Sequence, residues 1–99
     1  MIQRKTMENQ VTEIGSHERF VLGSKICYKL FLDKQGDCVG YRIRICREEE
    51  QAESFFGEDF LSVAVLFAEL VRGEVLPYSL EEIAEDFLLS EKIYREKSE

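Results

Sequence analysis

The spacing of hydrophobic side chains changes once along this chain, near Gly57. Before it, apolar residues recur at every second position, the repeat of a β-strand with one buried face. After it they recur every three or four positions, the repeat of an amphipathic helix. A chain of 99 residues has room for one small domain. We therefore expect an α+β fold, an antiparallel β-meander of three to four strands covered on one face by two C-terminal helices.

Two runs in the first half show the strand repeat most clearly. Their apolar positions are Ile26, Tyr28, Leu30, Leu32, Val39, Tyr41, Ile43 and Ile45. A four-residue loop at 34–37 would place Leu30 opposite Tyr41 and keep all eight side chains on one face. A three-residue loop at 34–36 would separate them, because a one-residue slip turns every side chain to the opposite face. We therefore expect the four-residue loop.

The first hairpin and the last strand are predicted from shorter signals. Gly23 and Ser24 suit the two central positions of a type II′ turn, which would pair Val21 with Ile26. A further edge strand is predicted around 52–56.

Two amphipathic helices are expected after Gly57. The buried face of the first is Phe60, Val63, Ala64, Phe67, Leu70 and Val71, and Gly73 follows as its stop. Pro77 precedes the second, for which Ser79 and Glu82 have the spacing of a capping box, and Tyr78 and Ile83 that of a hydrophobic staple. Its buried stripe is predicted to be Leu80, Ile83, Ala84, Phe87 and Leu88.

The ends of the chain and its cysteines bear on location. Residues 1–10 are expected to form a flexible leader, with Met7 as an alternative start, followed by the domain at 11–89 and a charged tail at 90–99. No apolar stretch follows the early basic residues, so no secretory signal is expected. The most apolar stretch, 60–71, is shorter than the roughly 20 residues of a membrane-spanning helix.

Three cysteines without a CxxC pair indicate free thiols in a reducing compartment, and we expect a cytoplasmic protein.

Few residues of this chain suggest catalytic or metal-binding chemistry. His17 is the single histidine, and no motif places it beside Cys27 or Cys38 as a catalytic dyad. Acidic residues four apart on the second helix, Glu81 with Glu85 and Glu82 with Asp86, read as a solvated face rather than a metal site. We find no phosphate-binding loop and no nucleophile elbow. The sequence therefore predicts no catalytic residue, no cofactor and no metal.

Charge is divided unevenly between the halves of the chain. The net charge is −7; residues 1–50 contribute +1 and residues 51–99 contribute −8. The acidic half repels nucleic acid and anionic lipid. The polar face of the predicted sheet is basic, and an open basic face with an aromatic residue can bind an anion or single-stranded nucleic acid. Its candidate residues are Lys25, Lys29, Phe31, Arg42 and Arg44, with Lys29 opposite Arg42 in the expected register. The alternative is a solvated face that is neutralised by the acidic tail or by Glu13 and Glu18.

The first helix carries a second apolar stripe on the face expected to be wet. Its residues are Leu61, Val65 and Ala68, at i, i+4 and i+7. A helix that is apolar nearly all round is either buried on both sides or carries a partner surface, and deep burial on both sides is hard to arrange in a two-layer domain this small. We therefore expect a non-enzymatic interaction or regulatory module that self-associates, as a homodimer, or binds another protein. The alternative is an anion- or nucleic-acid-binding module that uses the basic face.

The C-terminal half also carries a family resemblance. The segment LFAELVRGEVLPYSLEEIAEDFL, preceded by YRIRI, joins an apolar helix through a short link to a capped helix. The residues that carry the pattern are Val75, Pro77, Leu80, Glu85, Asp86, Phe87 and Leu88. In this pattern residues 18–89 resemble a family of small single-domain proteins of unknown function from Gram-positive anaerobes. The chain departs from the family at 57–59, where a Ser or Asp helix cap is expected. The resemblance implies a cytoplasmic single-domain protein and brings no activity, cofactor or catalytic residue.

Overall fold

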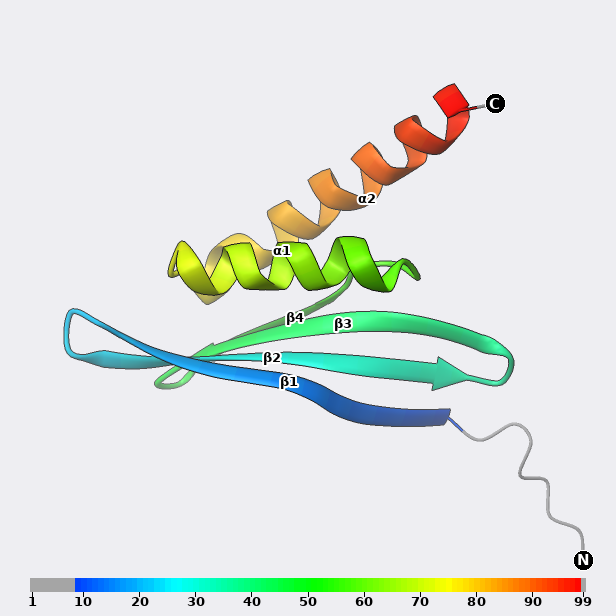
Figure 1. Cartoon of the computed structure of the whole chain (residues 1–99). Coiled ribbons are helices and arrows are strands. Elements are labelled where there is room, and N and C mark those ends of the chain that lie inside the picture. Colours follow the sequence, from blue (N-terminus) through cyan, green and yellow to red (C-terminus); the bar gives the residue numbers. More distant parts are fainter. Residues whose placement is uncertain (1–8, 99) are drawn as a thin grey trace, which may run out of the picture.

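The computed structural model describes residues 9–98, with side chains up to residue 93 (Figure 1). Strands β1 (Asn9–Val21), β2 (Ser24–Gln35), β3 (Cys38–Arg47) and β4 (Glu50–Phe55) form one antiparallel sheet in the order β1-β2-β3-β4. Helix α1 (Phe60–Arg72), the short 3₁₀ helix η2 (Pro77–Ser79) and helix α2 (Leu80–Ser98) follow. Figure 1 shows α1 lying along one face of the sheet. The predicted α+β fold is confirmed. Of the expected leader, residues 1–8 lie outside the described residues, and β1 begins at Asn9.

The core lies between α1 and the face of the sheet that the alternation predicted. Its fully buried large side chains are Tyr28, Phe56, Ile26, Ile43, Ile45, Leu80 and Val63. Phe67, Leu70 and Val71 of α1 also lie in this core, as predicted, whereas Phe60 at the start of the helix is 45% exposed and contacts the Tyr41 ring at 5.5 Å between centroids. The opposite face of the sheet, which we call the outer face, carries the side chains of the alternate positions.

The first hairpin turns one residue earlier than predicted. Val21 pairs with Ser24, so Leu22 and Gly23 are the central residues of the turn, and Arg19 rather than Val21 faces Ile26. Leu22 and Gly23 have φ values of 52° and 87°. Positive φ at both positions is the pattern of a type I′ turn, whose twist matches that of the flanking strands. The predicted Gly23-Ser24 turn is therefore wrong, because Leu22 adopts a left-handed conformation that its residue type does not signal.

The second hairpin has a shorter loop than predicted. Gln35 pairs with Cys38 across a two-residue turn, Gly36-Asp37, and Leu30 faces Ile43 rather than Tyr41. Gly36 has a φ of +61°, as the first central residue of a type II′ turn does. The predicted four-residue loop is wrong by a shift of two residues. A shift of two leaves each side chain on its own face, so the predicted buried face is nevertheless the observed one.

Helix α1 begins after Asp59, which occupies the N-cap position but makes no side-chain capping hydrogen bond among the described residues. Asp59 has extended backbone angles, and its carboxylate accepts a hydrogen bond from the Ser62 hydroxyl at 2.7 Å. At the other end, Glu74 rather than Gly73 adopts positive φ, at 54°. The amides of Glu74 and Val75 donate to the carbonyls of Val71 and Leu70, the two bonds of a Schellman motif.

Helix α2 starts at the predicted place but not by the predicted capping box. The chain becomes helical at Pro77, in η2, so Ser79 already lies within a helical turn and the extended residue is Leu76. Among the described side chains, Ser79 makes no capping hydrogen bond, and Tyr78 is 76% exposed and forms no staple. Leu80 and Ala84 are buried as predicted, while Leu88 is 37% exposed. The helix continues to Ser98, through the residues expected to form a charged tail.

Candidate interaction surfaces

The second apolar stripe of α1 is open to solvent. Leu61 is 71% exposed and Val65 is 60% exposed, and Ala68 on the same line is exposed as well. These positions follow one another at i, i+4 and i+7, so they form a continuous line on the helix surface. Val63 and Phe67, which lie between them in sequence, and Leu70, two residues after Ala68, are buried in the core. Helix α1 is therefore apolar on two faces, and only one of them is covered by the domain.

A shallow groove runs beside this stripe, between α1 and α2. It has a volume of about 430 Å³ and is lined by Leu61, Ser62, Val65, Leu66, Glu69, Phe87 and Glu91. Leu66 and Phe87 are partly buried and pack against the core, so the floor of the groove is fixed by the fold. The groove extends the exposed apolar surface from α1 toward α2.

The basic residues of the outer face contact carboxylates of neighbouring strands, and its aromatic residue is covered. Phe31 is only 8% exposed, and the Arg44 guanidinium lies 4.7 Å from the centroid of its ring. Such a cation–π contact uses the ring face that a nucleotide base would stack on. The predicted aromatic platform is therefore covered in this structure.

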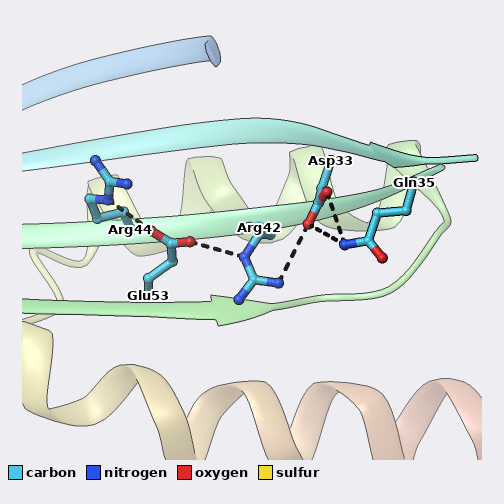
Figure 2. Close-up of polar contacts among 5 residues, drawn as sticks. All are labelled: Asp33, Gln35, Arg42, Arg44 and Glu53. Atoms are coloured by element: carbon cyan, nitrogen blue, oxygen red, sulfur yellow. Dashed lines mark hydrogen bonds and ion pairs between the residues drawn. The ribbon is translucent and has the colours of Figure 1, made fainter. Parts of the chain in front are cut away.

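An ion-pair network crosses β2, β3 and β4 on the outer face (Figure 2). Glu53 accepts hydrogen bonds from the Nε atoms of Arg42 and Arg44, at 2.9 and 2.8 Å. Arg42 also reaches the buried carboxylate of Asp33 at 3.6 Å. Burial by itself raises the pKa of Glu53, but the hydrogen bonds from the two arginines outweigh it and hold that pKa below its usual value.

The two lysines of the predicted basic face are paired in the same way. Lys29 lies 3.3 Å from Glu13, and Lys25 lies 3.5 Å from Glu18, both on neighbouring β1. All four basic candidates of this face thus contact a carboxylate. The structure brings the predicted residues together, but Lys29 faces Arg44 rather than Arg42, and no continuous bare basic patch results among the described residues.

The sheet separates His17 from the neighbouring thiol. His17 pairs with Tyr28, whose side chain is in the core, and its ring lies 6.0 Å from that of Phe67 on α1. Cys27 is the next residue along β2, so its side chain points to the outer face. Cys38 is exposed at the start of β3, beside the second turn.

One cross-strand pair on the outer face was not predicted from the sequence. Cys27 is the direct cross-strand partner of Cys46. The signal was present in the sequence, since the two cysteines lie equally far from the Gly36-Asp37 turn. The predicted four-residue loop hid it, because that register sets Cys27 against Arg44.

Over the described residues, no group of three or more His, Cys, Asp or Glu side chains is placed to hold a metal ion. In the same part of the chain, neither helix combines the length and the apolar character needed to cross a bilayer.

Comparison with known proteins finds no match to this chain among protein-family models, curated proteins or solved structures. The family resemblance noted in the sequence therefore stays a prediction.

Proposed function

We propose that this chain is a small protein-interaction module that forms a homodimer through the second apolar stripe of α1, formed by Leu61, Val65 and Ala68. The observation that carries the proposal is the solvent exposure of Leu61 and Val65, 71% and 60%, on a helix whose other face is buried in the core. Contiguous exposed apolar surface on a small domain is typical of a binding site.

The charges at the two ends of the stripe favour a second copy as the partner. Arg72, at i+4 from Ala68, continues the line at the C-terminal end, and Glu58 lies just before the helix at the other end. Both side chains are exposed, and neither forms an ion pair among the described residues. The stripe thus has an acidic end, an aliphatic middle and a basic end.

This order is self-complementary only when two copies of α1 run antiparallel. In a two-fold symmetric contact each residue i meets residue j, and j meets i. An axis near Val65 sets Leu61 against Ala68 of the partner and Arg72 near Glu58 of the partner. Antiparallel packing also brings opposite ends of the two helix dipoles together. A parallel pair would instead place like charges side by side.

The groove between α1 and α2 supplies the remaining area. A stable interface buries about 800 Å² on each partner, more than three aliphatic side chains provide. Leu66 and Phe87 in the groove extend the apolar surface next to Val65. A side chain from the second copy would enter this groove, with the aliphatic stripe at the centre of the contact.

Binding of nucleic acid is supported less well. Each of Lys25, Lys29, Arg42 and Arg44 lies within 4 Å of a carboxylate, and Phe31 is covered by Arg44. A phosphate would have to displace these carboxylates against a net charge of −7.

Light scattering coupled to size exclusion tests the dimer directly. We expect the full chain to elute with the mass of two copies, and Val65→Glu to elute as a folded monomer, because a charge at the centre of an apolar contact is left unpaired. Leu89→Glu is the matched control, since Leu89 is an aliphatic residue on α2 with similar exposure, 56%, and lies outside the groove. A monomeric parent chain, or a Val65→Glu dimer, would overturn the proposal.

A charge exchange tests the antiparallel orientation. Arg72→Glu should weaken the dimer about tenfold or more by setting like charges at both ends of the contact. Adding Glu58→Arg to that variant restores opposite charges and should return the affinity toward that of the parent chain. If the double variant is no tighter than Arg72→Glu alone, the antiparallel arrangement is wrong. Circular dichroism of each variant verifies that the fold is kept.

A further inference from the structure

Cys27 on β2 and Cys46 on β3 are directly opposite one another in the register of the sheet. Both thiols are free and half-buried, and both side chains stand on the outer face. Directly opposed residues of antiparallel strands have Cα atoms about 4.5 to 5.5 Å apart. That separation lies within the range of about 4.4 to 6.8 Å over which disulfides form.

The surroundings of the two sulfurs differ. Gln51 on β4 lies beside Cys46, with its side-chain oxygen 3.5 Å from Sγ, and Glu18 on β1 faces Cys27. Lys29 and Arg44 form the next cross-strand pair on the same face. Burial raises the pKa of the Cys46 thiol, and the nearby charge of Arg44 opposes this only in part. Cys46 is thereby kept mainly as the thiol, which is the less reactive form.

We propose that Cys27 and Cys46 form a dithiol site on the outer face that a peroxide converts to a cross-strand disulfide. The Cys27 thiolate attacks one peroxide oxygen, the O–O bond breaks, and the departing hydroxide takes a proton to become water. The sulfur of Cys46 then attacks the Cys27 sulfenic acid. The S–S bond forms, the S–O bond breaks, and the hydroxyl leaves as a second water with the proton of Cys46. In sum, two thiols are oxidised by two electrons and one peroxide is reduced to two waters.

The site stands apart from the proposed dimer contact. The outer face lies on the side of the sheet away from α1, so the two thiols do not belong to the stripe or to the groove. The third thiol, Cys38, serves as an internal reference. It is exposed at the turn and its register partner is Gln35, so it has no opposing sulfur.

Intact mass spectrometry of the full chain tests the proposal. The reduced protein is treated with hydrogen peroxide, and the remaining thiols are then blocked with N-ethylmaleimide. We expect a loss of about 2 Da, one blocked thiol instead of three, and reversal by dithiothreitol. Trypsin cleaves after Lys25, Lys29, Arg44 and Arg47, so the disulfide should join the peptides 26–29 and 45–47.

Single substitutions identify the pair. Cys38→Ser should form the disulfide as the parent chain does, whereas Cys27→Ser and Cys46→Ser should each lose it. Three blocked thiols after peroxide, a bond that includes Cys38, or a bond only between two chains would each overturn the proposal. Because serine is close to cysteine in size, circular dichroism is expected to show an unchanged fold for all three variants.

Discussion

Leu22 is the residue whose conformation departs furthest from its type. It is a non-glycine residue with φ of 52°, in the first central position of a type I′ turn, and its side chain is fully exposed. A left-handed conformation costs an L-residue roughly 1 to 2 kcal/mol, and Asn tolerates it better. Because the leucine side chain is fully exposed, it buries no apolar surface that could offset this cost.

We therefore predict that Leu22→Asn stabilises the domain by about 1 kcal/mol, which corresponds to roughly 4 to 8 °C in the melting temperature of a domain this size. Thermal unfolding followed by circular dichroism measures it. Leu22→Ala removes the same exposed surface but keeps the strain, so it should show no comparable gain. Equal melting temperatures for the two variants would count against the strain.

Glu53 is the residue on which the outer-face network depends. The hydrogen bonds from Arg42 and Arg44 hold its pKa below the value in the unfolded chain, even though burial acts in the opposite direction. A carboxyl group of this kind stabilises the folded state at pH values above its unfolded pKa. That stabilisation is lost as pH falls through the lower, folded pKa.

We expect Glu53→Gln to lower the free energy of unfolding by about 1 kcal/mol at neutral pH, because the carboxylate is still partly exposed. In urea unfolding, the difference from the parent chain should shrink as pH falls below the ordinary pKa of a glutamate. Glu50→Gln, at the more exposed pair with Arg47, is the control and should change stability little. A difference for Glu53→Gln that stays constant with pH would contradict this account.

At the scale of elements, the link between α1 and α2 is tied to the sheet by two polar contacts. The hydroxyl of buried Tyr28 donates to the Val75 carbonyl at 2.9 Å. Arg19 of β1 contacts Glu74 at 2.8 Å. Both acceptors follow directly after the helix end at Gly73, so these bonds hold the chain where it turns from α1 toward α2.

Tyr28→Phe should therefore destabilise the domain by about 1 kcal/mol, because it leaves the Val75 carbonyl without this donor while keeping the ring in the core. Chemical unfolding of the variant provides the measurement. Tyr78→Phe is the matched control, since the Tyr78 side chain is 76% exposed and makes no hydrogen bond among the described residues. Equal losses in the two variants would show that the hydroxyl of Tyr28 contributes nothing specific.

Strands and helices differ in how far the sequence predicts them. Alternation placed Tyr28 and Ile43 on the buried face because a strand repeats every two residues. The same repeat is satisfied by registers that differ by two residues, and the loop at 34–37 was accordingly predicted too long. For α1, the helical repeat predicted both the buried face and the exposed stripe, since each follows from angular position on one helix.

Across the whole domain, the two faces of the sheet are covered by different kinds of contact. One is covered by α1 and supplies most of the core. The other has no helix over it among the described residues and is closed by ion pairs that β1, β2 and β4 make with the basic side chains. The stripe of Leu61, Val65 and Ala68 on α1 lies on the helix side of the domain, where it is exposed and is not covered by the core, and we assign the dimer contact to it.

The sequence was sufficient to predict the fold class, the buried faces of β2 and β3, and a surplus apolar stripe at Leu61, Val65 and Ala68. These properties follow from local periodicity, which depends only on the repeat of a strand or a helix. Which residues face one another across the strands could be read only from the three-dimensional structure. It set Arg42 and Arg44 against Glu53 and Cys27 against Cys46, because strand register depends on turn geometry and on contacts between distant residues. The basic residues and their neutralisation by Glu13 and Glu18 were therefore predicted, whereas the ion pairs with Glu53 and Asp33 and the opposed pair of thiols were not.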